Sequence, residues 1–157
     1  PGSGINRTFV GVQDYGAFEI IDGQKKEISV SSQGSLRGSI AAMTMDEHLP
    51  ALQPLNREVQ KRVLDSGGQI RNMVAGALDI SLIAAGVFDL SLHHCMIWDM
   101  AAASVILTEA GGKIDTRTRE GDDYIETICS NGNIQADFVE TYEGAKHETG
   151  VWFTEQR

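Results

Sequence analysis

The chain has 157 residues, 41% of them hydrophobic, and a formal net charge of −9, which fits one globular domain with its own core. The acidic balance, without a cluster of Lys and Arg, argues against a nucleic acid or an anionic membrane as a partner. No apolar run is long enough to cross a bilayer, and no secretory signal pattern opens the sequence. The two cysteines lie far apart and form no CxxC pair, so we expect a reducing, cytoplasmic setting.

The N-terminal part of the chain predicts short antiparallel strands. Residues 8–20 mix β-branched and aromatic side chains with glycines, which predicts two strands around a turn. The Asp-Gly pair at 22–23 predicts a hairpin turn into another strand over 25–31. Because no helix separates these strands, we interpret residues 5–32 as part of a sheet of their own. Residues 1–4 read PGSG, which is typical of a vector scar, so the prediction of the fold leaves them out.

The rest of the chain alternates predicted strands and helices. Apolar, β-branched segments predict strands at 39–45, 87–92, 112–115 and 126–133. Apolar spacing with Pro or Gly at the ends predicts helices between Pro54 and Gly67 and at 76–86, 99–110 and 133–142. This alternation predicts a layered α/β domain over 36–142, with a mixed sheet flanked by helices, followed by a tail over 143–157.

The stretch IWDMAAASVILTEAGG at 97–112 allows two roles for Asp99. Asp is a favoured N-cap, because its carboxylate accepts a hydrogen bond from a backbone N–H of the first turn. A carboxylate at a helix N-terminus can also bind a divalent cation, and the positive end of the helix favours a nearby phosphate. An acidic protein that handles phosphates needs such a cation between the negative groups. The residues alone leave both roles open.

The same stretch resembles the C-terminal signature of the inositol monophosphatase family, W-D-x-A-A-x-x-x-I/L-x-x-E-A-G-G. Residues 15–31 resemble the family's G-x-G-A-F-x-N-G-x-x-I-x-V-S segment, and residues 76–89 resemble its A-A-L-x-x-x-x-V-A-A-G-x-x-D segment. SNGN at 130–133 is similar to its closing strand and turn. The resemblance covers roughly 8–140 and implies the C-terminal α/β domain of that fold, preceded by the last strands of its N-terminal sheet.

The resemblance also implies a function. In that family the aspartate after the Trp binds a catalytic Mg²⁺, so Asp99 would be a catalytic residue and a metal ligand, with Mg²⁺ as the cofactor. The substrate would be a small sugar or polyol phosphate, hydrolysed by metal-activated water, and the protein would form a homodimer. The family's Glu-Glu pair and D-P-x-D-G-T motif, which hold the other metal ions, do not occur in this sequence. The chain would therefore be the C-terminal half of such an enzyme.

Three residues are candidates for contact with the substrate. Ala75 and Gly76 stand where the family has G-S/T-A-A, which contacts the substrate's ring, and the hydroxyl of that motif is missing here. His94 precedes Asp99 closely and is taken to line the site. A zinc site in HHC is not expected, because strand neighbours face opposite ways and no second ligand pair has usable spacing. Leu92 replaces a Glu that binds a sugar hydroxyl in the family, which argues against inositol itself.

Two further interpretations stay open at this point. The chain alone can be a non-catalytic fragment or module that acts in dimerisation or in weak binding of phosphate ligands. Asp79 and Asp89 are expected to be solvated at the edges of their elements, or to pair with Arg71.

Overall fold

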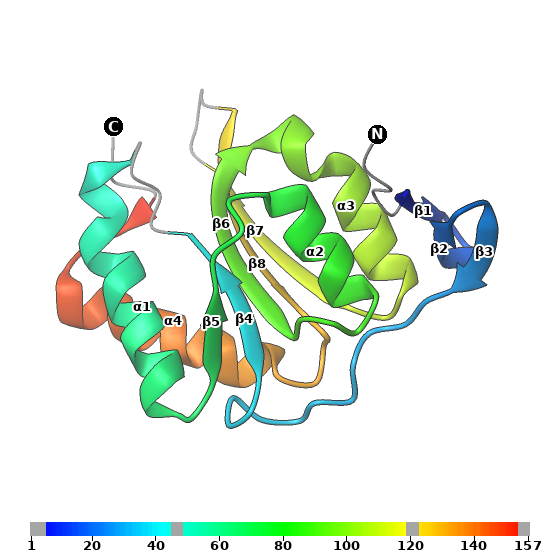
Figure 1. Cartoon of the computed structure of the whole chain (residues 1–157). Helices are drawn as coiled ribbons and strands as arrows, with labels where there is room; N and C mark the ends of the chain where they lie inside the picture. Colours follow the sequence, from blue (N-terminus) through cyan, green and yellow to red (C-terminus); the bar gives the residue numbers. More distant parts are fainter. Residues whose placement is uncertain (1–5, 45–48, 119–122, 154–157) are drawn as a thin grey trace, which may run out of the picture.

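A computed structural model describes residues 6–44, 49–118 and 123–153, which form layers of sheets and helices (Figure 1). The N-terminal strands are β1 (Arg7–Val12), β2 (Gly16–Ile21) and β3 (Gln24–Glu27). The larger sheet contains β4 (Ile40–Met43), β5 (Gln69–Arg71), β6 (Leu90–Met96), β7 (Lys113–Thr118) and β8 (Tyr124–Ser130). The helices are a short 3₁₀ turn (Pro50–Leu52), α1 (Gln53–Asp65), α2 (Gly76–Ala84), α3 (Ile97–Glu109) and α4 (Gln135–Thr149). The expected fold class, a mixed α/β sheet flanked by helices with a small antiparallel sheet before it, is confirmed.

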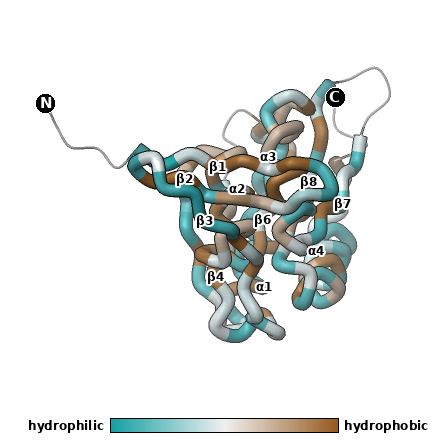
Figure 2. Tube along the Cα trace, turned by 90° about the vertical axis from the view of Figure 1, so that its right-hand side faces the viewer, coloured by the Kyte–Doolittle hydropathy of each residue, from teal (hydrophilic) through white to brown (hydrophobic). Residues whose placement is uncertain are grey.

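The small sheet is an antiparallel β1-β2-β3 meander, as its sequence predicts. Asp22 and Gly23 both have positive φ angles, 49° and 84°, which is the conformation of the expected hairpin turn. β3 ends at Glu27, earlier than the expected strand over 25–31, and its side chains are polar and exposed (Figure 2). Charged side chains of this kind discourage edge-to-edge pairing with another sheet.

The small sheet packs on α3 through close contacts of the backbone. A Cβ at Gly11 of β1 would lie 2.8 Å from the backbone N and Cα of Ile106, so only glycine allows this approach. Glu109 accepts hydrogen bonds from the backbone N–H groups of Asp14 and Gly16, at 3.0 and 2.9 Å. The Glu of the E-A-G-G sequence thus fixes the β1–β2 turn against the end of α3.

The large sheet has the strand order β5-β4-β6-β8-β7. β5, β4 and β6 are parallel, and β8 and β7 are antiparallel to their neighbours. α2 and α3 cover one face of the large sheet, and α1 and α4 cover the other. The four layers are therefore, in order, the small sheet, the α2–α3 layer, the large sheet and the α1–α4 layer (Figure 1). α2 follows β5 and α3 follows β6, so both helices begin at the carboxyl ends of the parallel strands, where α/β sheets commonly bind ligands.

Alternation along β6 divides the core between the two faces of the sheet. Leu90 and Leu92 are buried with α1 and α4, whereas Ile125 and Cys129 of the neighbouring β8 are buried with α2 and α3. The structure thus places apolar side chains on both faces of the sheet and a helix layer over each.

Within the described residues no helix is long and apolar enough to cross a membrane.

Several boundaries differ from the sequence-based expectation. β6 runs over Leu90–Met96 rather than 87–92, and the three residues of β5 were not expected at all. α4 continues to Thr149, so residues 143–149 are helical rather than part of a tail. The suggested vector scar at 1–4 lies outside the described residues.

Gly112, which follows α3, is expected to tolerate no larger side chain. A Cβ there would lie 2.2 Å from Cδ1 of Leu107 and 2.8 Å from the carbonyl oxygen of Ser130. Gly112→Ala should lower the free energy of unfolding by about 1–3 kcal/mol, measured by urea denaturation. Gly34→Ala is the control, because nothing lies within 4 Å of a Cβ there, and it should change stability by less than about 0.5 kcal/mol. Equal stability of the two variants would contradict this packing.

Candidate functional site

Asp99 lies in the first turn of α3, but it is not the N-cap of that helix. α3 begins at Ile97, its N-cap is Met96, and no side chain caps it. The expected capping role is therefore wrong, since Asp99 is the third residue of the helix. Its side chain is exposed at the positive end of α3. A carboxylate that is exposed and not used as a cap is available to a ligand.

The structure brings Gly76 next to the turn that carries Asp99. A Cβ at Gly76 would lie 2.6 Å from Cε of Met100, the residue that follows Asp99. Ala75 is the N-cap of α2, whose first turn also lacks a side-chain cap. Val74 has a φ of 52° and is 79% exposed, an unusual backbone for a β-branched residue. Strain of this kind costs about 1–3 kcal/mol and tends to occur where ligands bind.

The structure does not bring His94 into this group. His94 lies on the face of β6 that α4 covers, its side chain is 0% exposed, and its Nε2 is 3.0 Å from Oε2 of Glu126. His93 is the histidine that faces α2, because a Cβ at Gly76 would lie 3.5 Å from its Nδ1. The sequence contains a signal for this arrangement. Side chains two apart in a strand share a face, so His94 lies on the same face as the core residue Leu92, and His93 lies on the opposite face.

The two aspartates expected at the surface are both buried, and that expectation is wrong. Asp79 is 0% and Asp89 7% exposed. Asp89 accepts hydrogen bonds from the backbone N–H of Ile40, at 2.7 Å, and from the hydroxyl of Ser31. Asn131 donates to the same Ser31 hydroxyl at 2.9 Å. Asp89 thereby joins the segment after β3 to the central strands, which is a structural role.

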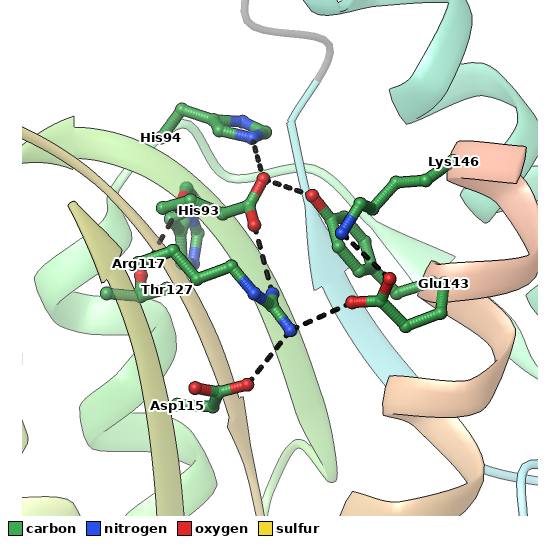
Figure 3. Close-up of polar contacts among 9 residues, drawn as sticks. His93, His94, Asp115, Arg117, Thr127, Glu143 and Lys146 are labelled. Carbon is green, nitrogen blue, oxygen red and sulfur yellow. Dashed lines mark hydrogen bonds and ion pairs between the residues drawn. The ribbon is translucent and has the colours of Figure 1, made fainter. Parts of the chain in front are cut away.

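Glu126 is the centre of a buried polar cluster on the face of the large sheet that α4 covers, where Figure 3 shows His94, Arg117 and Glu143. Its side chain is 0% exposed and is bonded to Nε2 of His94, to Nη1 of Arg117 at 3.0 Å and to the hydroxyl of Tyr142. Three further charged side chains surround this centre: Asp115, Glu143 and Lys146. Arg117 forms ion pairs with Asp115 at 3.0 Å and with Glu143 at 3.2 Å, and Lys146 pairs with Glu143 at 2.8 Å.

The cluster stabilises the charged form of Glu126. Desolvation raises the pKa of this carboxyl, but the hydrogen bond and charge of His94, the hydrogen bond of Tyr142 and the charge of Arg117 outweigh it, so the pKa lies below its usual value. Burial and the neighbouring Glu126 raise the pKa of the Tyr142 hydroxyl, so it remains a donor. The cluster holds α4 against β7 and β8 and lies on the face away from Gly76.

The described residues supply too few ligands to hold Mg²⁺ by themselves. Mg²⁺ prefers six oxygen ligands in octahedral geometry and is often held by one or two carboxylates plus substrate oxygens and water. Among residues 6–44, 49–118 and 123–153, no group of three or more His, Cys, Asp or Glu side chains could hold a metal ion. Asp99 has the chemistry of one ligand, and the others would have to come from outside these residues.

Comparison with known proteins agrees with the signature around Asp99. Residues 5–147 match the inositol monophosphatase family. The chain belongs to this family. Nus factor SuhB of Haemophilus influenzae is 29% identical over 91 residues, which are 55% of this chain and 33% of that protein.

Solved structures show the same fold. An inositol monophosphatase from Anabaena superposes with a TM-score of 0.73 at 22% identity, covering 88% of this chain and 57% of that one. The one from Thermotoga maritima gives 0.74 at 24% identity, covering 92% and 54%. The extragenic suppressor protein SuhB of Bartonella henselae gives 0.73 at 26% identity, covering 88% and 52%. This member of the family thus spans about half the length of these structures.

Proposed function

We propose that this chain is part of a Mg²⁺-dependent phosphomonoesterase that hydrolyses a small sugar or polyol phosphate. Family membership supports a phosphatase-type role. The observation that carries the proposal is the position of Asp99, exposed in the first turn of α3 with no capping role to occupy it. Gly76 adjoins that turn through Met100, and two uncapped helix N-termini lie at the same edge of the sheet. Such helix ends favour a phosphate group.

Each part of this site has a defined task in the proposal. Asp99 provides one carboxylate ligand to Mg²⁺, which when bound polarises phosphoryl oxygens and lowers the pKa of its water. The backbone N–H groups at the start of α2, around Ala75 and Gly76, are donors for substrate oxygens. Leu92 is buried in the core and cannot contact a sugar hydroxyl, so inositol itself is not the proposed substrate.

The test is phosphate release from glycerol 2-phosphate and p-nitrophenyl phosphate, measured with Mg²⁺ and with EDTA. We expect the 157-residue chain to show at most weak turnover, because hydrolysis with two metal ions needs several converging carboxylates and Asp99 provides one. A longer protein that adds a Glu-Glu pair and D-P-x-D-G-T before Ile5 should hydrolyse these esters only with Mg²⁺. If such a protein released no phosphate with Mg²⁺, or released it equally in EDTA, the proposal would fail.

A non-catalytic module is the second candidate. The observation that favours it is the absence of a group of metal-binding side chains among the described residues. One relative also carries the name of a Nus factor rather than of a phosphatase. A coding sequence that lacks both motifs upstream of Ile5 would favour the module, and a sequence that contains them would favour the enzyme.

Two further expectations belong to the proposal. We expect a homodimer in the cytoplasm, without nucleic acid or membrane as a partner. Neither Cys95 nor Cys129 forms a disulfide, which fits a reducing compartment, and burial raises the pKa of Cys129 to about 12. Sedimentation of the purified chain would test the dimer.

A further inference from the structure

Asp79 is a buried carboxylate to which the proposed function gives no task. It lies on α2, one turn after Gly76, and its side chain is 0% exposed. Within the part of the chain that the structure describes, neither of its oxygens accepts a hydrogen bond. Burying a carboxylate without such partners is costly, so a buried Asp of this kind needs a reason.

His93 of β6 is the charged or chargeable group that faces Asp79. Its Nε2 lies 3.6 Å from Oδ2 of Asp79, and its side chain is 4% exposed. This distance suits an ion pair and is slightly longer than a hydrogen bond. The two side chains therefore meet in the closed layer between α2 and the large sheet.

Within the described part of the chain, the other groups that the contacts place around this pair are neutral. α2 packs against α3, β6 and β8. α3 contributes Met100, and β6 contributes Cys95, which shares the face of His93. β8 contributes Thr127, the register partner of His93, whereas Glu126 lies on the other face and is bonded to His94. Among the residues that the structure describes, no second carboxylate or cation is placed against Asp79, and burial raises its pKa to about 6.

The pair lies directly beneath the first turn of α2. A Cβ at Gly76 would lie 3.5 Å from Nδ1 and 3.6 Å from Cγ of His93, so the ring supports the backbone of that turn. No side chain caps the turn, and Val74 just before it has a left-handed backbone. The position of Ala75 and Gly76 therefore depends on what lies beneath them.

We propose that Asp79 and His93 are positioning residues, a proton-sharing pair that holds the first turn of α2, and with it Ala75 and Gly76, in place for a phosphate ester. While the pair shares a proton it carries no net charge. When the proton leaves, a net negative charge remains beneath the uncapped N–H groups of the turn and attracts them. The identity of the ligand rests on the proposed function, but the coupling between the pair and the turn does not.

The coupling is tested by NMR on the 157-residue chain between pH 5 and 8. We expect the amide resonances of Gly76 and Ala77 to follow the same midpoint as the imidazole of His93. Asp79→Asn should shift the His93 midpoint by at least one pH unit and remove the change at Gly76. His147→Gln is the control, since His147 lies on α4, where its ring meets Trp152 edge-on, and it should leave both titrations unchanged. Amides of Gly76 and Ala77 that do not titrate, or that titrate equally in Asp79→Asn, would overturn the proposal.

A double variant keeps the test decisive if Asp79→Asn does not fold. Asp79→Leu with His93→Leu replaces the pair by apolar side chains, an exchange that proteins often tolerate. It should fold and lose the titration at Gly76, and a retained titration would overturn the proposal.

Ligand binding separates this inference from the proposed function. Inorganic phosphate with Mg²⁺ is titrated into the same samples, and the shifts of Gly76 are followed. We expect weak binding to the wild type and at least tenfold weaker binding to Asp79→Asn. Equal affinities in the two proteins would overturn the positioning role. No binding to the wild type, with the pH coupling present, would count against the ligand of the proposed function and leave the coupling in place.

Discussion

Asp99→Asn is expected to abolish Mg²⁺-dependent phosphatase activity while leaving the fold nearly unchanged. An amide oxygen is a neutral and weaker ligand for Mg²⁺, so kcat should fall by at least about 100-fold in a protein that hydrolyses phosphate esters. Stability should change little, because Asp99 is exposed and caps nothing. The lost interaction with the helix dipole is worth about 0.3–1 kcal/mol. Phosphate release and thermal unfolding measure the two effects.

Asp137 provides a matched control for this experiment. It is also an exposed aspartate at the third position of a helix, α4, which likewise lacks a side-chain cap. Asp137→Asn should therefore have the same small effect on stability and no effect on hydrolysis. Retained activity in Asp99→Asn, or an equal loss in Asp137→Asn, would remove Asp99 from the catalytic site.

The local elements of the fold could be predicted from the sequence because their signals are local. Leu55, Val59 and Val63 lie four residues apart, and all three are buried by α1. The Asp22–Gly23 pair predicts the hairpin turn because both residues tolerate positive φ. The alternation of such elements was enough for the fold class.

Features that depend on distant partners could not be predicted in the same way. β5 has three residues and is a strand because β4 lies beside it, which no periodicity reveals. The start of α3 lies two residues before Asp99, because the strand β6 continues to Met96 and the helix follows without a loop. The prediction that Asp99 caps α3 was therefore wrong, although Asp is a residue type that favours the N-cap position.

The candidate site shows the same division between local and distant information. The signature around Asp99 was sufficient to find that residue and the family. The choice between His93 and His94 depended on which face of β6 the core of α1 and α4 covers. Asp79 and Asp89 resembled surface residues because their partners, His93 and Ile40, lie far away in the sequence. Buried polar pairs were the part that sequence reasoning missed.

Glu126→Gln is expected to be the most destabilising of these substitutions. The change keeps the size of the side chain but removes the charge that Arg117, His94 and Tyr142 surround. Breaking a buried charge cluster on one side costs about 3–5 kcal/mol, because the remaining charge stays buried without compensation. Urea denaturation at neutral pH measures the loss. Glu143→Gln is the control: its side chain is 36% exposed, and it should cost less than about 1 kcal/mol.

The pH dependence of this loss distinguishes a charge effect from a packing effect. Glu126 has a lower pKa in the folded protein than its ordinary 4.5, so its contribution is complete above that value and is lost as the pH falls through the folded pKa. The difference in stability between wild type and Glu126→Gln should therefore be constant at neutral pH and shrink in acid. A difference that stays the same at all pH values would mean that the shape of the side chain, rather than its charge, holds α4 against the sheet.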